Sequence, residues 1–193
     1  MRKALLALFF VTGIPAWAVP IYFTFSGTIT GTFNGSPITN EPFVFNATAD
    51  TTNIGTDVGF RSVMNDSVTL SLLGNDYTVT TPTLTSVFHG GGGRPVLYNS
   101  TENAAIVDGP SNSIFTGWDL LSSLGPITDT GVIQVFGSPV HTSGGNLVYE
   151  DNFDATLTFN AEVAPEPSTL GFALLGFGAL AALRRRGRLP ISL

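Results

Sequence analysis

Two segments of the chain alternate strictly between apolar and polar positions. From Ile21 to Phe33 the odd-numbered positions are apolar or glycine, and the even-numbered ones are tyrosine, threonine or serine. From Phe153 to Val163 the odd-numbered positions are again apolar. Because successive side chains of a strand point to opposite faces, both segments predict strands with one buried face. We expect the two to pair. The first is either a strand pair or one long strand, in which Gly27 and Gly31 allow a bulge.

Shorter apolar runs between these segments predict further strands. Gly74-Asn75-Asp76 separates two of them and predicts a hairpin turn, while the glycine-rich stretch His89–Arg94 predicts a mobile loop joining two parts of the fold. With about ten short strands and turn residues at intervals of roughly 8–12 positions, the pattern favours an antiparallel β-sandwich or jelly roll over residues 19–162. The shorter strands are expected around Phe43-Phe45, Val68–Leu72, Tyr77-Val79, Leu84–Phe88 and Ile133–Val135.

The first 18 residues have the pattern of a secretory signal peptide. Arg2 and Lys3 precede an apolar run over residues 4–11, and the segment ends in Ala16-Trp17-Ala18. A positive start, a short apolar helix and an A-x-A ending are typical of segments that signal peptidase removes. The apolar run is about half the length that spans a bilayer. We therefore expect residues 1–18 to be a signal helix cleaved after Ala18, and not a membrane anchor.

A second targeting pattern lies near the other end of the chain. Pro165-Glu166-Pro167 is followed by an uncharged apolar segment at residues 169–183 and by Arg184, Arg185, Arg186 and Arg188 within residues 184–188. At 1.5 Å per residue, a helix over the apolar segment extends about 22 Å, short of a bilayer core of about 30 Å. Arginines beside an apolar helix stay on the cytoplasmic side. The pattern predicts a short transmembrane helix with the preceding passenger domain outside the inner membrane.

These three parts, in this order, resemble the PEP-CTERM sorting signal of Gram-negative bacteria, a segment also known as the ice-binding protein C-terminal domain. The resemblance covers residues 163–188. It implies that exosortase, a membrane-embedded cysteine protease, processes the tail near the Pro-Glu-Pro sequence and that the passenger reaches the cell surface or an exopolysaccharide matrix. Many members read Val-Pro-Glu-Pro, whereas here Ala164 separates Val163 from Pro165, and the chain continues past the arginines to Leu193. The position of the cut therefore stays open.

Charge and composition narrow the function of the passenger. The chain has 193 residues, of which 43% are hydrophobic and only 11% are charged, and it has no cysteine. Two arginines, Arg61 and Arg94, stand against thirteen acidic residues between positions 19 and 164, which gives a formal charge of −11. Such a surface repels phosphate backbones and argues against nucleic-acid binding. Thiol catalysis and cysteine-ligated metals are excluded.

Catalysis has little support in the sequence. The two histidines, His89 and His141, lie in no recognisable catalytic motif. An extracellular hydrolase would need one of them within reach of a carboxylate and a nucleophile. We expect no enzyme activity and no cofactor.

Two groups of residues are candidate binding sites. Glu150, Asp151 and Asp154 place carboxylates close together and could serve calcium, although a solvated turn explains them without a metal. Trp118 and Asp119 could contact a glycan, with a buried core tryptophan as the alternative. Several Thr-x-Thr pairs also occur, at irregular intervals, as expected on the solvent faces of strands.

The sequence thus favours an exported, non-catalytic structural or interaction protein of the cell surface, the biofilm or the exopolysaccharide matrix. Its expected partners are signal peptidase, exosortase, the inner membrane in transit and an extracellular polysaccharide. The alternative is a glycan- or calcium-binding extracellular module that is delivered in the same way.

Overall fold

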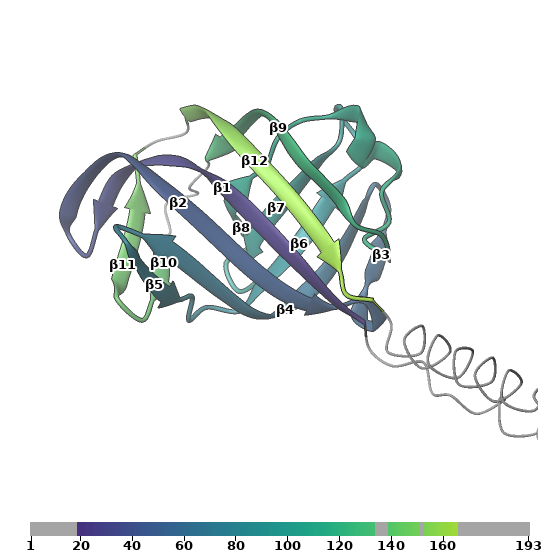
Figure 1. The fold of residues 1–193 in the computed structure, drawn as a ribbon, viewed down its shortest axis with the longest axis horizontal. Coiled ribbons are helices and arrows are strands. Elements are labelled where there is room, and N and C mark those ends of the chain that lie inside the picture. Colours follow the sequence, from purple (N-terminus) through teal and green to yellow (C-terminus); the bar gives the residue numbers. More distant parts are fainter. Residues whose placement is uncertain (1–18, 134–138, 151–152, 166–193) are drawn as a thin grey trace, which may run out of the picture. The chain divides into compact units, whose positions relative to one another are not determined.

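The computed structural model describes residues 19–133, 139–150 and 153–165, and these residues form an all-β fold (Figure 1). Two short 3-10 helices, η1 (Thr51–Asn53) and η2 (Ser113–Gly117), lie between strands. The strands are β1 (Pro20–Phe33), β2 (Ser36–Asp50), β3 (Gly55–Asp57), β4 (Phe60–Leu72), β5 (Asn75–Thr78), β6 (Thr83–Phe88), β7 (Arg94–Asn99), β8 (Ala104–Asp108), β9 (Leu124–Ile133), β10 (Val140–Thr142), β11 (Gly145–Tyr149) and β12 (Phe153–Val163).

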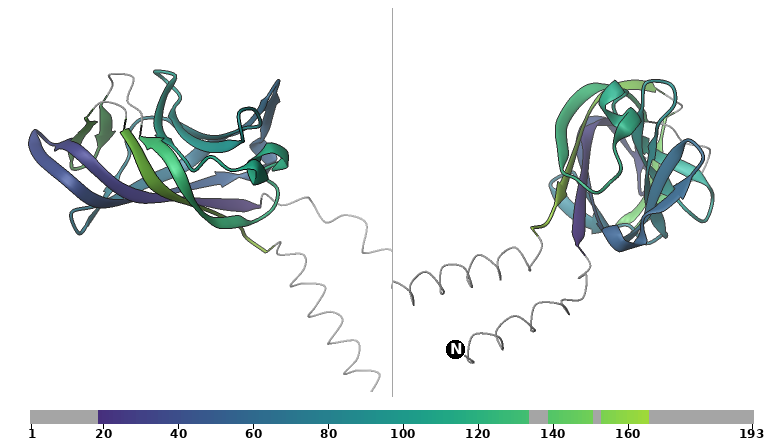
Figure 2. Two further views of the ribbon diagram at one scale, coloured as in Figure 1. Left: turned by 90° about the horizontal axis from the view of Figure 1, so that it is seen from above. Right: turned by 90° about the vertical axis from the view of Figure 1, so that its right-hand side faces the viewer.

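The strands join into one antiparallel sheet that nearly closes on itself. The order of neighbours is β1-β12-β9-β8-β7-β6-β4-β2, and β2 pairs again with β1. Pairing is extensive around this ring except between β8 and β9, where Asp108 and Val132 are the only paired residues among those described. The fold is therefore a nearly closed barrel with one weak seam. Figure 2 shows the rounded wall in its right-hand view.

The predicted all-β antiparallel class is confirmed, but the predicted sandwich or jelly roll of two packed sheets is wrong. Strands β1, β2 and β4 are 14, 15 and 13 residues long. Long antiparallel strands twist and coil enough to bring the two edges of one sheet together. Alternation along a strand shows that one face is buried. It does not show whether a second sheet or the opposite wall of the same sheet covers that face.

The core lies inside the barrel and is built from the alternating positions. In β1, Ile21, Phe23, Phe25 and Ile29 are buried, as predicted for one face of a strand. The expected pairing of the two patterned segments is confirmed, because β1 runs antiparallel to β12 with Phe25 opposite Phe159. The first segment is one long strand. A register shift between Ile29 and Gly31 marks the bulge that the glycines were expected to allow.

Two tight hairpins have the same geometry but different sequences. Asn34-Gly35 joins β1 to β2, with φ of 50° and 79°, and Leu73-Gly74 joins β4 to β5, with φ of 53° and 75°. Two central residues with positive φ are what a type I′ turn requires. The hairpin expected at Gly74-Asn75-Asp76 is confirmed, but its turn is centred one residue earlier, because Asn75 already pairs with Leu72.

The end of the barrel that holds these two turns is called the far end. There the last residues of β1 pair with β11, which in turn pairs with β10. Val79, directly after β5, forms a bridge to Thr142 of β10. These contacts give the far end a smaller second ring of strands.

The predicted signal helix (residues 1–18) and the predicted transmembrane helix (residues 169–183) lie outside the described residues. Within the ranges that the structure describes, no helix is long and apolar enough to cross a membrane.

Candidate functional site

The sorting tail leaves the barrel where β1 begins and β12 ends. Ile21 lies opposite Val163, and the backbone N–H of Ala164 donates a 2.9 Å hydrogen bond to the carbonyl oxygen of Pro20. The β3–β4 hairpin and the loop around η2 lie at the same end of the molecule (Figures 1 and 2). We call this end, made of residues 19–22, 57–59, 111–123 and 162–165, the tether end.

An aromatic cluster supports the tether end from inside. The rings of Phe115 and Trp118 each lie 5.6 Å from the ring of Phe159, measured between centroids, and the Phe23 ring lies 6.5 Å from that of Trp118. The indole N–H of Trp118 donates to the carbonyl oxygen of Ser122 at 2.9 Å. This cluster holds the loop that follows η2 against β1 and β12.

The predicted glycan contact at Trp118 and Asp119 does not form as an exposed platform. Trp118 is only 5% exposed, in agreement with the alternative of a core tryptophan, so its ring offers no free face to a sugar. Asp119 uses a carboxylate oxygen to accept a 3.0 Å hydrogen bond from the backbone N–H of Leu121. Both residues thus shape the loop between η2 and β9.

One ion pair lies beside the seam between β8 and β9. Arg94 Nη1 is 3.2 Å from Asp108 Oδ2, and the Asp108 side chain is almost wholly buried while that of Arg94 is about half exposed. Burial raises the pKa of the Asp108 carboxyl above its ordinary value, although the Arg94 guanidinium acts in the opposite direction. Burial also raises the pKa of the neighbouring Tyr98. The pair places a desolvated charge at the least-paired point of the sheet.

The two histidines lie at opposite ends of the barrel. His89 Nε2 is 3.1 Å from the carbonyl oxygen of Trp118, and His141 Nδ1 is 2.8 Å from Asn146 Oδ1. Both of these partners are amide oxygens. The arrangement that a hydrolase would need is therefore absent from the hydrogen bonds of the described residues.

The structure leaves the predicted calcium residues largely undescribed. Glu150 is exposed, while Asp151 and the side chain of Asp154 lie outside the described part of the chain. In the ranges that the structure covers, no three histidine or acidic side chains gather into a metal-binding group. Calcium binding at residues 150–154 stays a prediction.

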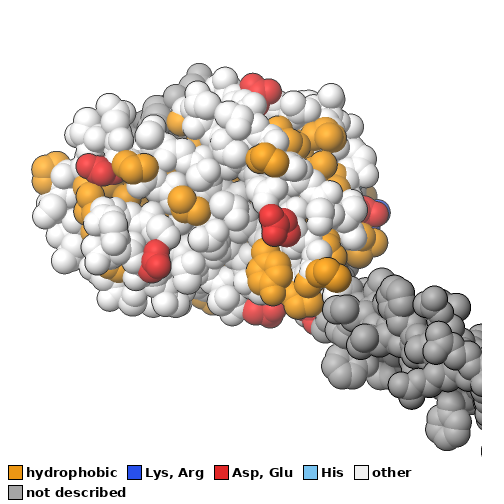
Figure 3. Space-filling model, viewed as in Figure 1, with side chains coloured by type: hydrophobic (Ala, Val, Ile, Leu, Met, Phe, Trp, Pro, Cys, Tyr) orange, Lys and Arg blue, Asp and Glu red, His pale blue; other side chains and the backbone are white. Residues whose placement is uncertain are grey.

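The outer face of the longest strands carries a row of uncharged polar side chains. The pairing register places five residues side by side across five strands, in the order Asn160, Thr24, Asn46, Thr69 and Thr78. Neighbours in such a row are about 4.8 Å apart, the spacing between strands. The Thr24 hydroxyl donates to Asn46 Oδ1 at 3.1 Å. We call these five residues the polar row. In Figure 3 much of this side of the barrel is white, the colour of the backbone and of uncharged polar side chains, with hydrophobic and acidic side chains between.

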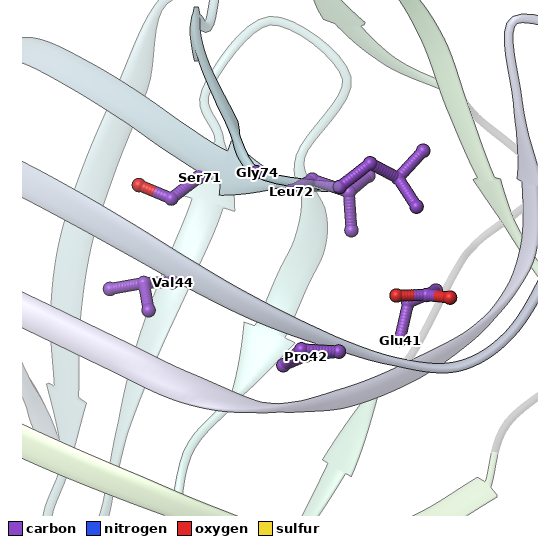
Figure 4. A pocket seen from close by; sticks show the side chains of 7 residues that line it. Glu41, Pro42, Val44, Ser71, Leu72 and Gly74 are labelled. Atoms are coloured by element: carbon purple, nitrogen blue, oxygen red, sulfur yellow. The ribbon is translucent and has the colours of Figure 1, made fainter.

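A shallow depression of about 280 Å³ lies beside the Leu73-Gly74 turn (Figure 4). Side chains from the start of β2 face the β4–β5 hairpin across it. Glu41 is the only titratable residue of its lining, so the depression does not provide an acid and a base together. It is lined by Glu41, Pro42, Val44, Ser71, Leu72, Leu73 and Gly74.

A compact β passenger whose last strand runs straight into a Pro-Glu-Pro sequence, an apolar segment and an arginine cluster belongs to the class of exported, sorted proteins. Residues 163–186 match the family model of the PEP-CTERM protein-sorting motif. This motif implies export, transit through the membrane and exosortase-dependent sorting to the cell surface. The match begins at Val163, so the extra Ala164 does not disrupt it. No curated protein and no solved structure matches the chain.

Sequence reasoning missed the polar row and the Arg94–Asp108 pair. The row needs the register of five strands, which no local pattern contains. The pair had a weak signal, because Arg94 is one of only two basic residues between positions 19 and 165. A lone cation in an acidic passenger is a natural partner for a buried carboxylate.

Proposed function

We propose that the passenger is a non-catalytic structural component of the cell surface or exopolysaccharide matrix, and that it contacts neutral stretches of polysaccharide through the polar row. The observation that carries the proposal is the alignment of Asn160, Thr24, Asn46, Thr69 and Thr78 on one outer face.

The chemistry of the polar row suits a sugar chain. Hydroxyl and amide groups both donate and accept hydrogen bonds, as sugar hydroxyls do. Strands hold these groups at fixed positions, which lowers the entropy lost when a long ligand binds. The five residues of the row carry no charge, and the adjacent Glu162 carboxylate accepts a 3.1 Å hydrogen bond from the side-chain amide of Asn160. Many weak contacts along a polymer can then add up to firm retention.

The described histidine contacts favour this role over a hydrolase. His89 and His141 are engaged with amide oxygens at opposite ends of the barrel, which leaves no acid–base pair assembled among the described residues. A binding role needs no such pair.

The test measures retention of the protein by the purified exopolysaccharide of its own host. Thr24, Thr69 and Thr78 are replaced together by valine, which keeps the branched shape that strands favour and removes the hydroxyl. Each lost hydrogen bond is worth about 0.5–1.5 kcal/mol, so the triple variant should bind at least about tenfold more weakly.

A matched control replaces three exposed threonines away from the row, Thr39, Thr56 and Thr101, by valine. The control should bind like the wild type, and both variants should keep its unfolding midpoint. Equal retention of all three proteins would refute the role of the polar row. Retention of the arginine tail on every molecule at the cell surface would refute sorting by exosortase.

A further inference from the structure

The path of the chain limits how far the tether end can lie from a membrane that holds the tail. Pro165 is the last described residue, and the apolar segment begins at Thr169. An extended chain covers at most about 3.5 Å per residue, so four steps reach about 14 Å. Whenever residues 169–183 are in the bilayer, the tether end must therefore be next to its surface.

Exposed apolar side chains gather at this end. Val58 at the tip of the β3–β4 hairpin is 97% exposed, and Leu121 in the loop before β9 is 56% exposed. Ile114 of η2 and Tyr22 at the start of β1 are also about half exposed. A fully exposed valine at a hairpin tip gains nothing in water, whereas it gains free energy in the interfacial layer of a bilayer.

Electrostatics alone would not select this orientation. Arg61 lies on β4, which starts at this end, and would be attracted to anionic lipid headgroups, whereas Arg94 at the start of β7 is already paired with Asp108. Asp57, Asp119 and Glu162 lie at this end too and offset that attraction. The apolar side chains are therefore the part of the surface that distinguishes a lipid interface from water.

We propose that the tether end is a membrane-contacting surface, and that Val58 and Leu121 insert into the outer interfacial layer of the inner membrane while the tail is embedded. The proposal rests on the sorting function, because the tail must be in the membrane. In this orientation the Pro-Glu-Pro sequence is held beside the lipid surface, where a membrane-embedded protease can reach it.

Two exposed apolar residues at the far end serve as control positions. Leu73 and Val148 are 46% and 42% exposed, so they match Leu121 and Val58 in residue type, while Val58 at 97% is the most exposed of the four. Leu73 lies in the turn between β4 and β5, and Val148 lies in β11 opposite Thr32 near the end of β1. Both are therefore expected to stay away from the lipid.

The experiment uses single cysteines in the full-length protein reconstituted into lipid vesicles. The chain has no cysteine of its own, so each label is unique. Four variants, Val58→Cys, Leu121→Cys, Leu73→Cys and Val148→Cys, are labelled with an environment-sensitive fluorophore. Quenching by a lipid that carries a nitroxide in its upper acyl chain is then measured, and vesicle flotation reports separately whether the protein is embedded.

We expect all four variants to float with the vesicles, with quenching at positions 58 and 121 roughly twofold or more above that at 73 and 148, since interfacial insertion reaches about 5–10 Å into the bilayer. Flotation with equal quenching at all four positions would overturn this inference and leave the sorting function standing. Failure to float would overturn both.

Discussion

The backbone N–H of Ala164 is hydrogen-bonded to the carbonyl oxygen of Pro20 across 2.9 Å. This bond joins the residue just ahead of the Pro-Glu-Pro sequence to the first residue of β1. Val163, where the sorting motif begins, is still paired with Ile21. The sorting signal therefore starts inside the folded sheet and not in a separate linker.

This pairing predicts where the tail is cut. A protease needs its substrate extended and unpaired, so cleavage should occur at or after Pro165 and leave β12 whole. The intact mass of protein recovered from the extracellular matrix should correspond to a chain that starts near Val19 and ends at or beyond Pro165. A mature chain that ends before Val163 would contradict the prediction, because β12 would have had to separate from β1.

Gly31 should tolerate no side chain. A Cβ at this position would lie 2.1 Å from the carbonyl oxygen of Val148 and 2.8 Å from the Cα of Tyr149, both of which belong to the backbone of β11. Gly31→Ala should therefore push β11 away from β1 and lower the free energy of unfolding by about 3 kcal/mol. Urea unfolding measures the loss. Gly55→Ala is the control, since its Cβ would meet no atom closer than 3.7 Å and should cost less than about 1 kcal/mol.

Asp108 should make stability depend on pH. Burial raises the pKa of this carboxyl, so the folded state holds the proton more tightly than the unfolded state does. Its contribution to stability is then present below the unfolded pKa of 3.8 and is lost as the pH rises through the higher folded pKa. Relative to the wild type, Asp108→Asn should therefore gain unfolding free energy as the pH is raised from about 4 to neutral.

Thermal or urea unfolding across this pH range checks the prediction, and a constant difference between the two proteins would contradict it. Arg94→Met is the companion variant. It leaves the buried carboxylate without its counter-ion, so it should destabilise the barrel by about 2 kcal/mol at neutral pH and by less in acid.

Leu73 occupies a backbone conformation that suits another residue. With a φ of 53° it precedes Gly74 in a turn of the kind that favours Asn-Gly. Leu73→Asn should stabilise the barrel by about 1 kcal/mol, because asparagine tolerates positive φ better than leucine does. The reverse change at the matching turn, Asn34→Leu, should destabilise it by a similar amount. Opposite shifts of the two urea midpoints would support this account, and shifts of the same sign would contradict it.

Patterns contained in one segment were the ones that the sequence could predict. The alternation in β1 and β12 reveals a buried face, and the sorting motif is a linear string of residues. The Asn34-Gly35 turn was not predicted, although Asn-Gly is a strong hairpin signal. The Leu73-Gly74 turn was placed one residue too late, because leucine rarely occupies positive φ and the neighbouring Asn75-Asp76 resembles a turn more closely.

Features that depend on distant strands could not be predicted. Closure of the barrel rests on a seam at which Asp108 meets Val132, and no local pattern pairs those two residues. The polar row depends on the register of five strands. Of its three threonines only Thr78 belongs to a Thr-x-Thr pair, so these pairs gave no sign that Thr24, Thr69 and Thr78 lie on one transverse line. The sequence could not show whether Trp118 is buried or exposed, because its burial depends on how the segment around η2 packs against the distant Phe159.

The antiparallel pairing of β1 and β12 also gives the passenger a direction of mechanical strength. A force that pulls the tail away from the far end acts along β12 and loads its hydrogen bonds to β1 and β9 together, in shear. A force that separates Val19 from Pro165 opens the β1–β12 pairs one after another, like a zipper. The same fold therefore resists a pull on the tail along β12 and yields readily when its two ends are drawn apart.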